Sequence, residues 1–201
     1  NISAQKAETV KSIPYPLEII NKPVSHMIAS DLVRISAAGK TNLFNSPSGD
    51  TPVQNAPMIL FQPEGDFTLS AKVTGDLQAI YDVAALVVYQ DENTWAKFCF
   101  ENSVEKEPTI VSVVTRIYSD DCNSIPTGTS AYMSVVKKGE EFSFFYSEDK
   151  TNWKLIRNFR LEPTDKLKVG FAAHGSRGEG FTAVFTDIYY YDRALDNMRR
   201  D

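Results

Sequence analysis

The 201-residue chain has few of the residues that build metal sites and disulfide frameworks. Its two histidines, His26 and His174, lie far apart without the spacing of zinc ligands, so a zinc site is not expected. No window reaches the ~18 uninterrupted apolar residues that a membrane span needs. The 21 lysines and arginines are outnumbered by 26 aspartates and glutamates. This acidic balance argues against nucleic acid and anionic membranes as partners.

The two cysteines leave two readings open. Cys99 lies in an alternating run and is simplest as a small buried thiol, whereas Cys122 lies in the polar stretch SDDCNS. A bridge between them requires that both side chains point into the same groove. The chain begins with Asn1, and NISAQKA resembles the stub left by a removed signal peptide, or an expression boundary. We therefore expect export to the periplasm or the exterior, with the cytoplasm as the alternative.

Helical periodicity is nearly absent, and short β-rich runs alternate with turn signals such as Lys138-Gly139-Glu140. With no linker to divide the series, we predict one all-β domain over residues 1–201: a jelly-roll sandwich of two antiparallel sheets. Residues 1–30 and 40–56 are expected to be irregular and to wrap an edge or a mouth, and 193–201 to form a short helix or a frayed tail. The predicted strands are 31–36, 57–61, 66–73, 79–89, 94–101, 109–118, 131–137, 141–147, 153–157, 167–173 and 182–191.

Two of these runs, ALVVY at 85–89 and TIVSVV at 109–114, are apolar on both faces. We expect them to be central strands whose second face is covered by loops or by a partner. The run 94–101 instead divides cleanly with period two. Ala96, Phe98 and Phe100 point one way, while Trp95, Lys97, Cys99 and Glu101 point the other.

An aromatic ring, a cation and a carboxylate on one rigid strand suit a groove that binds a sugar. Trp95 would stack on the ring, while Lys97 and Glu101 would hydrogen-bond hydroxyl groups. Asp82, Thr115, Ser119 and Asp120 extend this network if their strands lie beside it. The competing interpretation is structural: Trp95 caps the edge of the sandwich, and Lys97 and Glu101 form an ion pair.

A set of collinear segments resembles a known family. They include GDF at 65–67, YD at 81–82, NTWAKFCFE at 93–101, EPTIVSVVTR at 107–116 and VGFAAHGSRGEGFTAVFTDI at 169–188. Over residues 15–192 the chain resembles domain-of-unknown-function family 1349, and its C-terminal half is similar to the accessory β-sandwich of some β-xylosidases. The resemblance implies a concanavalin A-like lectin/glucanase jelly roll without a settled activity. A fungal relative described as a regulator of enolase suggests protein interaction within the family.

Catalysis is the weaker interpretation. Sandwich glucanases carry E-x-D-x-x-E on one strand, and this motif is absent here. The carboxylates left for such chemistry are Glu101 and Asp82, with Asp120 and Asp121 in a loop. The glycine-rich HGSRGEG could suggest a phosphate cradle, but no helix follows it, so we interpret it as a β-turn.

No cofactor is expected, except that a structural calcium ion could be held by Asp66 and Asp187. We predict a non-catalytic carbohydrate-associated module that binds glycan on its concave face. The alternatives are a protein-interaction or regulatory domain without sugar affinity and, second, a glycoside hydrolase.

Overall fold

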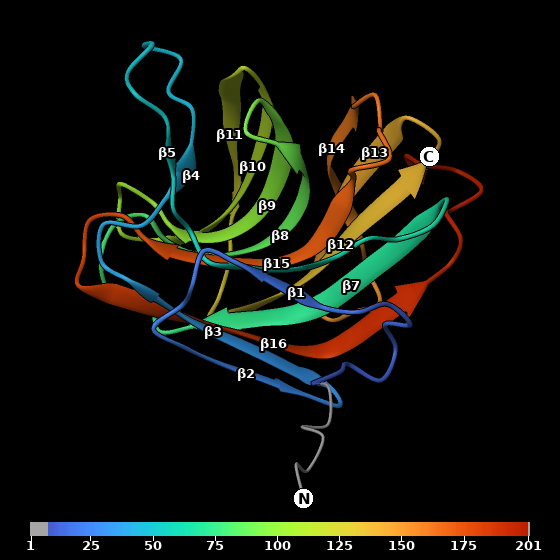
Figure 1. Cartoon of the computed structure of the whole chain (residues 1–201), viewed down its shortest axis with the longest axis horizontal. Helices are drawn as coiled ribbons and strands as arrows, with labels where there is room; N and C mark the ends of the chain where they lie inside the picture. The colour runs from blue at the N-terminus through green and yellow to red at the C-terminus, as the bar shows by residue number, and fades with distance from the viewer. Residues whose placement is uncertain (1–7, 201) are drawn as a thin grey trace, which may run out of the picture.

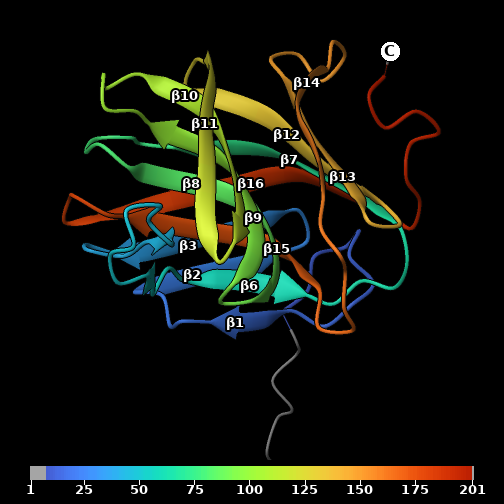
Figure 2. The ribbon, with the colours of Figure 1, turned by 90° about the horizontal axis from the view of Figure 1, so that it is seen from above.

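The computed structural model describes residues 8–200, in which all regular secondary structure is β-strand. Two seven-stranded antiparallel sheets lie face to face (Figures 1 and 2). In spatial order, the first sheet consists of β1 (Glu18–Ile20), β6 (Met58–Phe61), β15 (Lys168–Gly175), β8 (Asp82–Asp91), β9 (Thr94–Asn102), β10 (Pro108–Arg116) and β11 (Tyr118–Pro126). The second consists of β14 (Lys154–Arg160), β13 (Glu141–Ser147), β12 (Ser130–Lys138), β7 (Phe67–Gly75), β16 (Gly180–Tyr191), β3 (Leu32–Ala38) and β2 (Ser25–Ala29). A short hairpin, β4 (Leu43–Phe44) and β5 (Val53–Gln54), stands apart.

The two sheets bury one large apolar core between them, because alternate residues of each strand point inward. On β7, Phe67, Leu69, Ala71 and Val73 are buried while their neighbours are half-buried, as the alternation predicts. Paired aromatic rings cross the interface, and Phe98 of the first sheet stacks on Phe144 of the second with ring centroids 4.8 Å apart. This core confirms the predicted jelly-roll sandwich.

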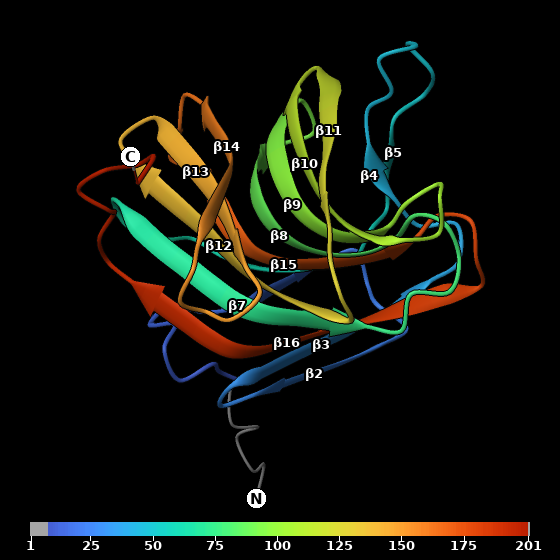
Figure 3. The same cartoon turned by 180° about the vertical axis from the view of Figure 1, so that it is seen from behind.

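The outer face of the first sheet carries a second apolar cluster. Strands β8 to β11 bend away from the second sheet, and the β4–β5 hairpin rises beside them (Figures 1 and 3). Leu43 of the hairpin packs in a cluster with Val87, Trp95 and Val111 of this face. The doubly apolar runs at 85–89 and 109–114 are therefore central strands covered on their second face by a loop, as predicted.

All eleven predicted strands are present, with small differences at their ends. The structure adds five that the sequence did not indicate: β1, β2, β4, β5 and β11. Residues 8–30 and 40–56 thus contain short strands rather than only irregular chain. The run predicted to end at 118 instead turns at Ile117, whose φ of 68° is left-handed, and continues as β11 along the sheet edge.

The C-terminal segment corrects a further expectation. Over 193–200 it forms neither a helix nor a frayed end. Met198 is buried against Val136 and Phe145 on the outer face of the second sheet, and Ser143 Oγ donates a 2.6 Å hydrogen bond to the Met198 carbonyl. Within residues 8–200 there is no helix of the length and hydropathy that a bilayer crossing requires. The predicted signal-peptide stub, 1–7, lies outside the described residues.

Candidate functional site

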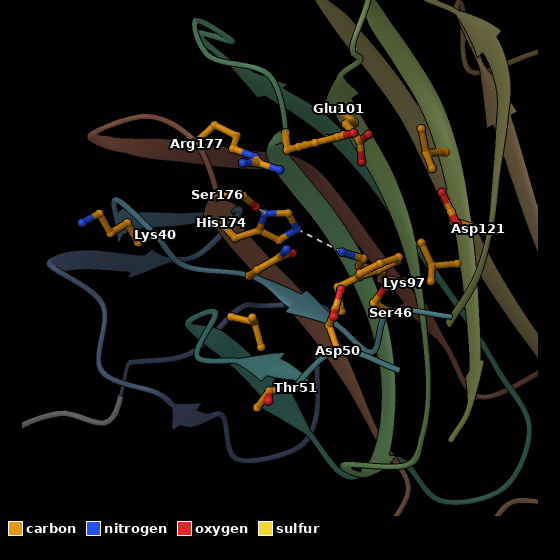
Figure 4. A pocket seen from close by; sticks show the side chains of 16 residues that line it. Lys40, Ser46, Asp50, Thr51, Lys97, Glu101, Asp121, His174, Ser176 and Arg177 are labelled. Carbon is orange, nitrogen blue, oxygen red and sulfur yellow. Dashed lines mark hydrogen bonds between the residues drawn. The ribbon is translucent and has the colours of Figure 1, made fainter. Parts of the chain in front are cut away.

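A cavity of about 480 Å³ opens on the outer face of the first sheet. Its walls come from four parts of the chain: strands β9 to β11, the β4–β5 hairpin with the segment before it, the end of β15 with the loop that follows it, and Tyr81 in the loop before β8 (Figure 4). The volume lies within the roughly 300–1,000 Å³ that is usual for small-molecule sites.

The strand register explains why polar side chains meet at the floor of the cavity. Val83 of β8 pairs with Glu101 on one side and with His174 on the other, so these two side chains share the outer face. Lys97 lies on the same face two pairing rows away, and the row between them holds the short side chains of Ala85 and Cys99. Small residues in that row leave room for the lysine chain to extend toward His174.

Lys97 and His174 form a buried polar pair. The Lys97 Nζ lies 3.0 Å from Nε2 of His174 (Figure 4), and their exposed fractions are 3% and 2%. An ammonium group has only donors, so Nε2 must accept this hydrogen bond and the ring proton must lie on Nδ1. Nδ1 then donates to Ser176 Oγ at 3.2 Å. Burial, reinforced by the Lys97 charge, keeps the pKa of His174 well below its ordinary value, so the ring is neutral.

Two aromatic rings lie near the Lys97 ammonium. The ring centroids of Trp95 and Phe44 are 5.9 Å and 6.0 Å from Nζ, within the range of a cation–π interaction. The two remaining N–H donors of Lys97 have no acceptor among the described residues. A buried cation with unused donors is poised to receive acceptor atoms of a ligand.

Glu101 is the buried carboxylate of the floor, 8% exposed. Burial raises its pKa to about 7, partly offset by the Lys97 charge and reinforced by Asp121. No described residue donates a hydrogen bond to this carboxylate, and it forms no direct ion pair with Lys97. The ion-pair interpretation of Lys97 and Glu101 is therefore wrong in its geometry: the two charges influence each other without contact.

The rim of the cavity is exposed and carries charges of both signs. Lys40 and Arg177 contribute cations, and Asp50 and Asp121 contribute carboxylates. Tyr81 is half-buried, with the Arg177 guanidinium carbon 5.9 Å from its ring centroid. The site thus combines a buried floor, whose donors can bind acceptor atoms of a ligand, with an exposed polar rim, whose side chains can bind hydroxyl groups.

Of the seven predicted binding residues, Lys97 and Glu101 line this cavity. Trp95 does share their sheet face, but it is fully buried and does not line the cavity. Its indole lies in the apolar cluster beneath the β4–β5 hairpin, and Nε1 has no hydrogen-bond partner among the described residues. The expectation that the Trp95 ring faces an open groove is corrected, because a hairpin that the sequence did not indicate covers it.

The other four predicted residues serve local structure. Asp82 is buried, and its Oδ2 accepts hydrogen bonds from the backbone amides of Gln78 and Ala79. Thr115 and Ser119 share a 2.8 Å hydroxyl contact. Asp120 is exposed and pairs with Arg157 at 3.3 Å. None of these four lines the cavity, so the structure does not bring them together with Lys97 and Glu101.

The sequence reasoning missed His174, Ser176 and Arg177, which HGSRGEG contributes to the site. This segment ends β15 in the first sheet and leads directly into β16 of the second sheet, so a strand and not a helix follows it, as predicted. The turn packs tightly against Gly39, where an added Cβ would meet the Gly178 carbonyl oxygen at 2.5 Å. Two charged or hydrogen-bonding side chains beside a histidine in a strand-to-strand turn were the available signal.

The calcium candidates lie apart from this site and face lysines. Asp66 lies 3.6 Å from Lys137 Nζ, and Asp187 lies 3.5 Å from Lys150 Nζ. Across residues 8–200, no group of three or more histidine, cysteine, aspartate or glutamate side chains has the geometry of a metal site. The cysteines are free: Cys99 is buried and Cys122 is exposed. Cys99 pairs with Val111, whereas Cys122 pairs with the next residue, so their side chains point to opposite faces.

This fold and this site define a class: a concanavalin A-like β-sandwich of the lectin and glucanase type, with an open polar cavity on the outer face of one sheet. The chain belongs to the family described as "Protein of unknown function (DUF1349)", whose model matches residues 19–192. The resemblance inferred from the sequence is thereby confirmed.

Three comparisons describe the neighbourhood of the chain. It is 23% identical over 170 residues to "Regulation of enolase protein 1" of Saccharomyces cerevisiae, covering 84% of this chain and 85% of that protein. A solved, functionally unknown protein from S. cerevisiae superposes with a TM-score of 0.80 at 20% identity, covering 90% of this chain and 97% of that one. A mutant of the GH43 protein BlXynB from Bacillus licheniformis superposes with a TM-score of 0.70 at 15% identity, covering 97% of this chain but 40% of that one. The solved structures establish the fold.

Proposed function

We propose that the chain is a non-catalytic module that binds carbohydrate in the cavity formed above Lys97, Glu101 and His174. The observation that carries this proposal is a buried ammonium and a buried carboxylate at the base of an open cavity, each with hydrogen-bonding capacity that no described residue uses. Such groups cost free energy in the empty protein, and a ligand rich in hydroxyl groups can satisfy both.

The sequence assigned stacking on the sugar to Trp95; in this proposal, other aromatic rings stack on it. Phe44 and Tyr81 line the cavity and are half-buried, so part of each ring is available to the C–H groups of a pyranose. The likeness of the fold to part of a GH43 glycoside hydrolase protein agrees with a carbohydrate context.

A glycan array followed by calorimetry tests the proposal. We expect binding by the unmodified chain and its loss in Lys97→Met, which keeps the length of the side chain and removes its donors. Lys154→Met is the matched control, because Lys154 is an exposed lysine on β14, outside the cavity. Absence of binding to every glycan, or equal loss in both variants, contradicts the proposal.

A regulatory protein-interaction role is the second candidate, and two observations favour it. The yeast relative carries the name of an enolase regulator. Tyr189 and Tyr191 of β16 are 42% and 46% exposed and stack on each other at 6.2 Å on the outer face of the second sheet. This role would be favoured if a protein copurifies with the unmodified chain but not with the Tyr189→Ala and Tyr191→Ala variants, and if the chain binds no glycan.

Glycoside hydrolysis is the remaining alternative. Glu101 and Asp121 line one cavity, and a carboxyl with a pKa of about 7 has the character of a general acid. Release of sugar from a polysaccharide by the unmodified chain, abolished in Glu101→Gln, would establish it. Asp82 and Asp120 have no part in such a reaction here, because they lie outside the cavity.

Two further parts of the proposal concern calcium and location. A structural calcium ion at Asp66 or Asp187 would raise the melting temperature, and melting with and without EDTA measures the difference. Export remains a prediction, with the cytoplasm as the alternative, and cell fractionation distinguishes the two.

A further inference from the structure

Two lysines are buried in the described part of the chain: Lys97 in the cavity and Lys137 outside it. Lys137 has an anionic partner, because its Nζ lies 3.6 Å from Asp66 Oδ1. The three cations of the cavity are Lys40, Lys97 and Arg177. None of these three forms an ion pair within the described part of the chain.

The lack of an anionic partner matters most at the floor of the cavity. Lys97 is buried, and its hydrogen-bond acceptor is a neutral imidazole rather than an anion. Glu101, the one carboxylate among the buried lining residues, does not contact the ammonium and is protonated to a large extent near neutral pH. A desolvated ammonium without a contacting anion is costly, and that cost falls when a ligand supplies the anion.

The rim of the cavity adds no net positive charge to that of the floor. Lys40 and Arg177 are offset by Asp50 and Asp121, so the rim has no net charge. Asp50 already accepts a 2.6 Å hydrogen bond from Ser48 Oγ. The unbalanced positive charge therefore lies at depth, at Lys97, where one carboxylate of a ligand could reach it while the rest of the ligand meets a mixed polar wall.

From these contacts we infer that the cavity selects an acidic sugar, a glycan unit whose carboxylate accepts hydrogen bonds from Lys97 while its hydroxyl groups bind Glu101 and the rim. This inference rests on the proposed carbohydrate function and narrows it to a substrate class. A neutral sugar would leave Lys97 without an anion, and a bare anion such as acetate would leave Glu101 and the rim unused.

The contact between the ligand carboxylate and Lys97 also predicts that Glu101 takes up a proton on binding. The charged or titratable groups around Glu101 are Lys97 on β9, Asp121 on β11, His174 on β15, and Tyr81 and Arg177 in the adjoining loops. A ligand carboxylate beside Lys97 weakens the help that the ammonium gives to ionised Glu101, so Glu101 takes up a proton. Affinity for the acidic sugar should therefore rise as pH falls from about 8 to about 6.

The test compares ligands that differ only in charge. Calorimetry would measure the binding of galacturonate and glucuronate trisaccharides and of their carboxyl-methylated forms to the unmodified chain. We expect the acids to bind at least about tenfold more tightly, the ratio typical of one charge-assisted hydrogen bond. Lys97→Met should remove the difference, and Lys154→Met should keep it.

The outcomes separate the inference from the function on which it rests. If the methylated or neutral sugars bind as well as the acids, the inference is overturned and carbohydrate binding stands. If no sugar binds, both are overturned. Should Lys97→Met not fold, the comparison of acid with ester on the unmodified chain still decides, because it requires no variant.

Discussion

Glu101 offers the sharpest test of how the site is built, because its burial has a measurable consequence for stability. Its pKa rises from an ordinary 4.5 to about 7 in the folded chain, mainly through desolvation. The folded protein therefore holds a proton that the unfolded chain has already released, and the free energy of unfolding falls as pH rises through this window. A shift of this size lowers that free energy by about 3 kcal/mol once Glu101 is ionised.

Glu101→Gln removes this effect, since glutamine resembles the protonated acid at every pH. At about pH 3.5 the variant and the unmodified chain should unfold with nearly equal free energies, because Glu101 is then protonated in both the folded and the unfolded state. At about pH 8 the variant should be more stable, by as much as about 3 kcal/mol. Urea unfolding at both pH values measures the two free energies, and their difference cancels the contribution of His174, which both proteins share.

An exposed carboxylate provides the control. Glu105 lies in the loop after β9, and Glu105→Gln should change stability by a similar small amount at both pH values. A gap between Glu101→Gln and the unmodified chain that does not widen with pH would refute the reasoning. Glu101 would then be hydrated or paired in solution, and the floor of the cavity would carry no desolvated carboxylate.

The remaining predictions concern the scaffold. Trp95→Ala should lower the free energy of unfolding by about 3–5 kcal/mol because it empties a fully buried site, whereas Trp95→Phe should cost less and leave ligand affinity unchanged; denaturant unfolding and calorimetry measure both. Gly170→Ala should cost about 1–3 kcal/mol, because its Cβ would clash with the backbone of β6, while Gly128→Ala, where a Cβ meets nothing within 4 Å, should be nearly neutral in the same assay. A thiol reagent should label Cys122 quickly and Cys99 only after denaturation, since burial raises the pKa of Cys99 to about 12; two slow thiols would contradict this.

Local alternation predicted the faces of β9 correctly, but it could not show what covers them. Trp95, Lys97 and Glu101 do share the outer face. Whether that face is open depends on the β4–β5 hairpin, whose strands are two residues each and too short to show a period. The hairpin seals Trp95 and stops short of Glu101, so one strand carries both a core residue and a cavity residue on the same side.

The contact between Lys97 and His174 could not be predicted from the sequence, for a different reason. His174 approaches Lys97 because β15 pairs with β8 and β8 pairs with β9, a register joining residues 77 positions apart. Nothing in the spacing of a single sequence records which strands become neighbours. Polar residues inside or just after a strand were visible, but their convergence was not.

The polar floor is best understood as a departure from the rule that the rest of the sheet follows. Around it, the outer face is apolar, with Val87, Val111 and Val113 packed in one cluster. Extending that pattern through positions 97 and 101 would remove two desolvated charges and, as a rule, leave a fold equally stable or more stable. The chain instead keeps a cation and a carboxylate there, beneath an opening that solvent and ligands can enter. Sites that break a local rule without a structural gain are where function is expected, and this is why Lys97 and Glu101, rather than the ring of Trp95, are the residues on which recognition should depend.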